Sequence, residues 1–172
     1  MYLNKNKEIY IENIYCSINI NNIENYLKRI ESLKKTINSK IEIFLIPNSY
    51  IYDEQQLFWG LFISKNKFLE KTNVSKKLWT ELLLTLDCTD QINRINKDWY
   101  IKTGKNKYFL LITDSKKIKK TDIKKIIKNL EVKTLERVVY LKKKAKEYYK
   151  IKDNKDILNK IIEKMVVSNL KN

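Results

Sequence analysis

The spacing of apolar residues changes at Asn21, and this change constrains the fold more than any other feature of the chain. Between residues 14 and 20 every second side chain is apolar, which is the pattern of a strand with one buried face. From residue 23 to 37 apolar side chains recur at every third or fourth position, as in an amphipathic helix. A chain that changes between the two periods within one short stretch packs strands and helices around a shared core.

The same two patterns continue along the rest of the sequence. Apolar stretches of strand length occupy residues 41–46, which Pro47 ends, and 108–112, which follow a turn at Gly104, and residues 132–140 indicate a last strand. Helical spacing fills residues 53–67, 75–86, 91–97, 121–130, 141–150 and 155–171. We therefore predict a single domain, residues 1–172, of the α+β class. It should hold a small, mostly antiparallel sheet of about four strands with a helical half packed against it.

The chain has no histidine and only two glycines, which excludes several kinds of catalytic and nucleotide-binding sites. Histidine is the commonest general base at neutral pH, and phosphate-binding loops need several glycines. Carboxylate chemistry is still open, with Asp87 and Asp90 as candidates for a metal-dependent nuclease, although carboxylates at a helix end are more commonly caps. We therefore expect a protein that is not an enzyme and that holds neither a cofactor nor a metal ion.

Lysine and arginine number 36 against 20 acidic residues, a formal net charge of +16. Such an excess indicates a polyanionic partner, most simply a nucleic acid. The alternative is a merely solvated basic surface, since lysine, asparagine and isoleucine all have A/T-rich codons. No apolar run approaches the roughly 20 residues that span a bilayer, and the N-terminus lacks an apolar signal core. We therefore expect a cytoplasmic protein with no membrane partner.

Three segments together resemble a known family: residues 75–86 with their Glu-Leu-Leu centre, the Asp90-Gln91-Ile92 tripeptide, and the apolar run 107–112. The closing helix, residues 161–170, also looks similar. The family is the kinase-binding regulatory subunit of the archaeal and eukaryotic KEOPS complex, and the resemblance covers roughly residues 41–172. It implies a non-catalytic subunit that binds the small atypical protein kinase of the complex, and through it the catalytic subunit. It also implies binding of the 3′ CCA end of tRNA, in support of threonylcarbamoyl-adenosine formation at tRNA position 37.

A single-stranded CCA end is held by side chains that stack on its bases and by cations that contact its phosphates. The segment 91–107 contains both kinds of side chain, and two lysines before it extend the basic rim. We predict RNA contacts at Lys76, Lys77, Gln91, Arg94, Lys97, Trp99, Lys102 and Lys105. The alternatives are a core position for Trp99 and a solvated loop for the lysines.

The surface that binds the kinase should be apolar and helical. The candidates lie on the predicted helices 53–67 and 155–171: Trp59, Phe62, Ile162, Met165 and Val166. Core packing is the alternative for each of them. For the whole chain, the alternatives are an unrelated basic RNA-binding module and a carboxylate-metal nuclease.

Overall fold

The computed structural model describes residues 2–3, 7–37 and 40–169. The chain divides into two compact units. The sheet unit comprises Met1–Pro47 and Tyr100–Val138, and the helical unit comprises Asn48–Trp99 and Val139–Asn172. Whether the two units fold as the single domain expected from the sequence stays a prediction.

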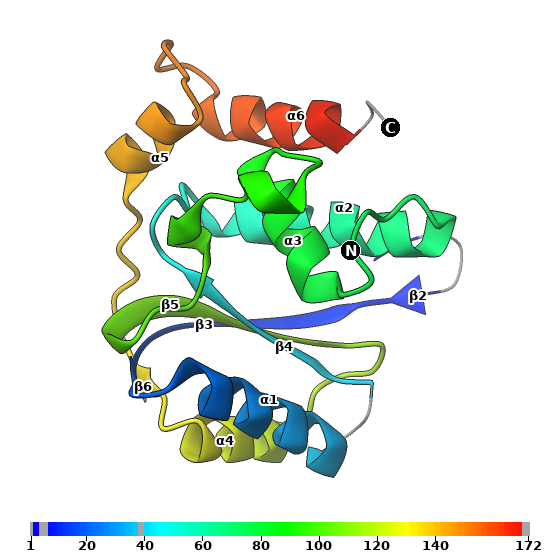
Figure 1. The fold of residues 1–172 in the computed structure, drawn as a ribbon, viewed down its shortest axis with the longest axis vertical. Helices are drawn as coiled ribbons and strands as arrows, with labels where there is room; N and C mark the ends of the chain where they lie inside the picture. Colours follow the sequence, from blue (N-terminus) through cyan, green and yellow to red (C-terminus); the bar gives the residue numbers. More distant parts are fainter. Residues whose placement is uncertain (1, 4–6, 38–39, 170–172) are drawn as a thin grey trace. The chain divides into compact units, whose positions relative to one another are not determined.

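A four-stranded antiparallel sheet forms the centre of the sheet unit (Figure 1). The strand order is β4 (Glu42–Pro47), β5 (Gly104–Asp114), β3 (Tyr10–Ile20) and β6 (Lys133–Thr134). β3 and β5 pair over their full length of 11 residues. The N-terminal β1 (Tyr2–Leu3) and β2 (Lys7–Glu8) form a separate two-stranded ladder. The predicted α+β class with a four-stranded antiparallel sheet is confirmed.

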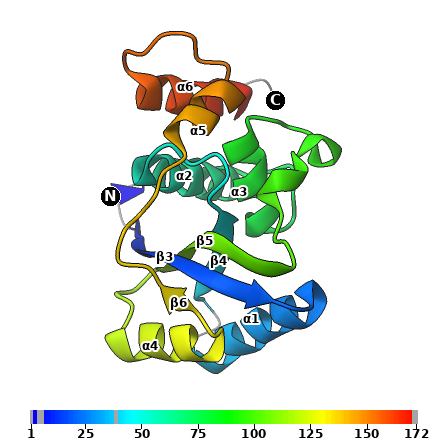
Figure 2. The same ribbon diagram turned by 90° about the vertical axis from the view of Figure 1, so that its left-hand side faces the viewer.

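Two helices of the sheet unit, α1 (Ile23–Ile37) and α4 (Lys120–Asn129), lie side by side on one face of this sheet (Figure 2). Their apolar stripes face inward because both helices are strongly amphipathic. The hydroxyl of Tyr26 on α1 donates to the carbonyl of Leu130 at the end of α4, over 2.9 Å. This buried hydrogen bond fixes one helix against the other.

The helical unit contains α2 (Glu54–Glu70), α3 (Leu78–Asp87), α5 (Lys142–Tyr148) and α6 (Ile157–Asn169). α2 packs against both α3 and α6. Gly60 allows the close approach of α2 to α3, because a Cβ atom there would lie 2.8 Å from a methyl carbon of Leu86. In the part of the chain that the structure describes, none of the helices has the length and apolar character needed to cross a membrane.

A buried ion pair joins α2 to α3. The Nζ of Lys67 lies 2.7 Å from Oε1 of Glu81, and the two side chains are 7% and 0% exposed. The second carboxylate oxygen of Glu81 accepts from the backbone N–H of Ser75 at 2.8 Å. All polar atoms of the carboxylate therefore have partners, which is the condition under which a buried charge is tolerated.

The structure differs from the sequence prediction in several elements. Only Lys133–Thr134 of the predicted strand 132–140 pairs with the sheet, because β6 meets β3 only at Cys16 and Ser17. The predicted helix at 91–97 is instead two short 3₁₀ turns, η1 (Ile92–Arg94) and η2 (Lys97–Trp99). α4 begins at Lys120, one residue before the predicted helical segment 121–130.

Replacing Lys67 by methionine should destabilise the protein by about 3–5 kcal/mol, because Glu81 then stays buried without a counter-charge. The double variant Lys67→Met/Glu81→Gln should recover most of this loss, since glutamine keeps an acceptor for the Ser75 N–H. Urea unfolding of both single variants and the double variant measures the coupling. The control is Lys28→Met, which breaks the exposed Lys28–Glu24 pair and should cost less than about 1 kcal/mol. Equal losses for Lys28→Met and Lys67→Met would contradict this account.

Candidate functional site

The loop at residues 89–97 leaves α3 in a direction set by a left-handed residue. Cys88 has φ 55°, and its N–H donates back to the carbonyl groups of Leu84 and Thr85. The N–H of Thr89 also donates to Leu84, at 3.1 Å. This arrangement is a common helix ending, which satisfies the last carbonyl groups and turns the chain away from the helix axis. The 89–97 loop therefore starts from a fixed point at the end of α3.

Asp87, the last residue of α3, holds the far end of the 89–97 loop. Its Oδ2 accepts from the backbone N–H of Asn96 at 2.7 Å, and its Oδ1 accepts from Nε1 of Trp99 at 3.0 Å. Burial raises the pKa of Asp87, while these two hydrogen bonds act in the opposite direction. Both carboxylate oxygens are thus engaged in closing the loop onto the helix.

A cluster of aromatic rings joins the same loop to α5. Tyr50 stacks on Tyr148 with 3.9 Å between ring centroids, and Trp99 is tilted against Tyr50 and packs edge to face with Tyr148. The hydroxyl of Tyr50 donates to Asp98 at 2.7 Å. Burial, followed by this hydrogen bond to a carboxylate, raises the pKa of Tyr50 to about 12. Asp87 and this cluster leave the loop few alternative conformations.

The loop presents a row of polar side chains to solvent. Gln91, Arg94 and Lys97 are exposed, and so are Lys76 and Lys77 in the turn that precedes α3. The N–H of Lys77 donates to the hydroxyl oxygen of Ser75 at 3.1 Å, which orders this turn. The four cations among these five side chains, Arg94, Lys97, Lys76 and Lys77, meet the basic requirement for a phosphate-binding surface, because they are accessible.

Trp99 does not share this exposure, and here the core alternative is the one that the structure shows. Its side chain is fully buried between Asp87, Tyr50 and Tyr148, so neither ring face is open to a base. Sequence reasoning missed Ile92, which is 47% exposed beside Gln91. Ile92 was missed because the helix expected at 91–97 would have buried it. The signal that could have found it is an isolated apolar residue in a polar loop.

Lys102 and Lys105 belong to the sheet unit, and both are exposed. The backbone of Lys102 is held by the hydroxyl of Tyr108, which accepts from its N–H and donates to its carbonyl group. Lys105 lies on β5 directly after Gly104, whose φ of 81° favours glycine. The neighbouring Tyr100 is 39% exposed, so the open aromatic ring of this segment is Tyr100 and not Trp99.

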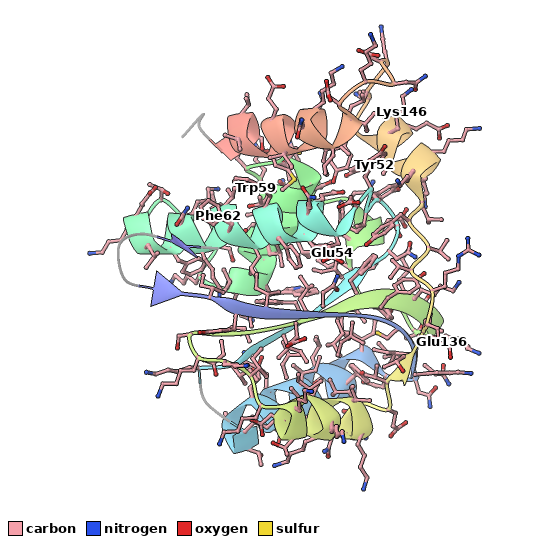
Figure 3. All side chains as sticks on the ribbon, turned by 180° about the vertical axis from the view of Figure 1, so that it is seen from behind. Tyr52, Glu54, Trp59, Phe62, Glu136 and Lys146 are labelled. Atoms are coloured by element: carbon pink, nitrogen blue, oxygen red, sulfur yellow. The ribbon has the colours of Figure 1, made fainter. Side chains whose placement is uncertain are left out.

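The predicted kinase-binding residues lie on α2 and α6, which pack against each other. Figure 3 shows Trp59 and Phe62 along α2, where their rings meet edge to face with 5.4 Å between centroids. Both are half-buried, as are Ile162 and Val166 on α6. These four side chains form what we call the α2–α6 apolar set.

Met165 does not belong to this set, because its side chain is fully buried. Core packing, the alternative considered for it, is therefore its role in the structure. Two exposed apolar residues of the same helices escaped sequence reasoning: Leu69 on α2, 49% exposed, and Val167 on α6, 46% exposed. Leu69 continues the spacing of Trp59 and Phe62 along the helix, and this periodicity was the signal that could have found it.

Within residues 2–3, 7–37 and 40–169, no three Cys, Asp or Glu side chains gather closely enough to hold a metal ion. Both oxygens of Asp87, one candidate of the nuclease hypothesis, accept hydrogen bonds from the chain itself. Its role in the structure is that of a cap for the 89–97 loop.

Replacing Asp87 by asparagine should destabilise the protein by about 2 kcal/mol. The amide nitrogen that replaces one carboxylate oxygen cannot accept a hydrogen bond, so the bond from either Asn96 or Trp99 is lost. Near-ultraviolet circular dichroism should report the loosened Trp99, and urea unfolding should give the free energy. The matched control is Asp90→Asn at the start of the same loop, with an expected change within about 0.5 kcal/mol. If Asp87→Asn were as stable as Asp90→Asn, Asp87 would not be the anchor of the loop.

Comparison with known protein families identifies the family of the chain. The family model described as kinase binding protein CGI-121 matches residues 15–171. A search of curated proteins found no match. The model covers nearly the whole chain, including α1 and the second half of β3, which lie before the part that carried the resemblance noted in the sequence. This family supplies the non-catalytic kinase-binding subunit of the KEOPS complex, in agreement with the expectation that the chain is not an enzyme. The chain therefore belongs to the CGI-121 family of kinase-binding proteins.

Proposed function

We propose that this KEOPS subunit binds the small atypical kinase of the complex through α2 and α6, and the 3′ CCA end of tRNA through the 89–97 loop. By holding the tRNA end it supports threonylcarbamoyl-adenosine formation at position 37. The kinase links it to the catalytic subunit of the complex. The observation that carries the proposal is the family match together with a constrained, exposed loop that displays Gln91, Ile92 and Arg94. A cytoplasmic location belongs to the same proposal.

The chemistry of the loop suits an unpaired RNA end. Ile92 offers an apolar surface for a base, while the amide of Gln91 can donate and accept hydrogen bonds at base edges. Arg94 and Lys97 supply exposed cations for phosphates. Because Asp87 and the aromatic cluster hold the loop, little conformational entropy is lost on binding.

The chemistry of the α2–α6 apolar set suits a protein partner. Trp59 and Phe62 are large aromatic side chains that keep part of their surface in water. Tryptophan and other aromatic residues are enriched at the centres of protein interfaces, where burying them contributes much of the affinity. Docking the kinase here removes this apolar surface from water and leaves the 89–97 loop available to RNA.

Intact tRNA should bind about tenfold or more tightly than the same tRNA without its CCA end, since each stacked base contributes about 1–3 kcal/mol. The variant Arg94→Ala should weaken binding of intact tRNA and lower the slope of log affinity against log salt by about 1. Arg137→Ala, at an exposed arginine of the sheet unit, is the matched control and should leave binding of both RNAs unchanged. Equal affinity for the two RNAs would remove the proposed end recognition and leave a basic module without end preference.

The kinase should bind the variants Trp59→Ala and Phe62→Ala about thirtyfold more weakly, which corresponds to about 2 kcal/mol for a central interface residue. Calorimetric titration of the full chain with the kinase measures this effect, and thermal unfolding confirms that each variant is folded. Val138→Ala replaces an apolar residue that is 39% exposed in the sheet unit and is the matched control. Folded α2 variants that bind the kinase as tightly as Val138→Ala would rule out this surface.

A further inference from the structure

Four lysines on α4 make a second basic surface that the proposed function does not use. Lys120, Lys124, Lys125 and Lys128 are all exposed, and we call them the α4 lysine face. Three more exposed lysines lead into the helix: Lys116, Lys117 and Lys119. The acidic side chain that α4 itself carries, Asp122, is partly buried. The face therefore presents concentrated positive charge to solvent.

The neighbouring helix α1 shows that this arrangement is not general in the sheet unit. On α1, Lys28 pairs with Glu24, and Lys34 pairs with Glu31 and Glu42. The ion pairs found among the described residues include no lysine of the α4 lysine face. Among the described residues, the two neighbouring helices therefore differ: Lys28 and Lys34 of α1 are in ion pairs, whereas the lysines of the α4 lysine face are in none of those found.

The spacing on α4 is unfavourable for the helix alone. Lys120, Lys124 and Lys128 follow one another at four-residue intervals, so their charges lie on one side of the helix and repel. Each such pair costs a few tenths of a kcal/mol, about as much as an oppositely charged pair would contribute. The helix is held instead by its inward stripe, in which Ile126 is fully buried. A polyanion that neutralises the α4 lysine face would relieve this repulsion.

The composition of the face selects among polyanions. A helix that binds a lipid surface needs exposed apolar side chains to enter the headgroup layer. On α4 the apolar positions Ile123, Ile126 and Ile127 are buried or half-buried, which leaves lysines and small polar residues outside. Lysine is a point charge on a flexible stem and suits phosphates better than base edges. The face therefore fits the sugar-phosphate backbone of RNA.

We propose that the α4 lysine face binds backbone phosphates of double-helical RNA, such as the stems of tRNA, without regard to sequence or to the CCA end. The proposal rests on the proposed function in taking RNA as the partner, but it uses other residues. The 89–97 loop recognises an end, whereas the α4 lysine face adds an electrostatic contact to a stem.

The test compares full-length protein with two quadruple variants of equal charge. The first variant replaces the α4 lysine face by glutamine, at Lys120, Lys124, Lys125 and Lys128. The second replaces four exposed lysines of the helical unit by glutamine: Lys143, Lys152, Lys155 and Lys164. A third variant carries arginine at the four α4 positions. Binding is measured against salt for tRNA without its CCA end, a blunt RNA duplex, and vesicles of acidic phospholipid.

The α4 glutamine variant should lose about tenfold or more in affinity for the duplex, and its salt slope should fall by about 3. The arginine variant and the helical-unit variant should bind the duplex like the unchanged protein. Equal losses in the two glutamine variants would mean that net charge alone governs binding, which overturns the proposal. Binding to the vesicles but not to the duplex would overturn it as well. If the CCA end proves irrelevant while the α4 variant still loses duplex binding, the proposed function fails and this inference stands.

Discussion

The half-buried carboxylate of Asp87 joins the end of α3 to the loop that follows it, and the aromatic cluster around Trp99 depends on that join. Its two oxygens take the N–H of Asn96 and the indole N–H of Trp99, and hydrogen bonds to a charged group contribute about 1.5–3 kcal/mol each. Trp99 in turn packs on Tyr50 and Tyr148, which brings α5 into the same cluster. Burial opposes the charge and raises the pKa of Asp87. The join holds because both oxygens have partners.

Anchoring the 89–97 loop from beneath leaves its outer side chains free for function. Gln91, Ile92 and Arg94 point into solvent from a backbone that the helix and the aromatic cluster already hold. The buried Lys67–Glu81 pair and the fit at Gly60 fix α2, one of the two helices that carry the α2–α6 apolar set, against α3. In both places the inward residues contribute stability, and their outward neighbours form the surfaces that we propose for binding. A non-catalytic subunit needs only these two kinds of residue, buried ones for stability and outward ones for binding.

Element types followed from the sequence wherever a long periodic pattern met a matching partner. The alternation before Asn21 became β3 because β5 pairs with it along its whole length. The segment after Val132 had no such partner along its length, and only Lys133 and Thr134 joined the sheet. Exposure was harder to predict: Ile162 and Met165 lie on one apolar helix, yet Met165 is fully buried and Ile162 is not. Trp99 is buried and the adjacent Tyr100 is exposed, because the indole N–H of Trp99 donates a hydrogen bond to Asp87.

The central claim is that one helical unit offers separate surfaces to a kinase and to a tRNA end. Hydroxyl-radical footprinting of side chains tests it directly, with the full chain alone, with each partner, and with both together. We expect the kinase to protect Trp59 and Phe62, tRNA to protect Ile92, and both partners together to protect all three residues. Trp99 should react little in every state, because it is buried. Loss of Ile92 protection when the kinase is added, or protection of Trp59 by tRNA alone, would contradict the claim.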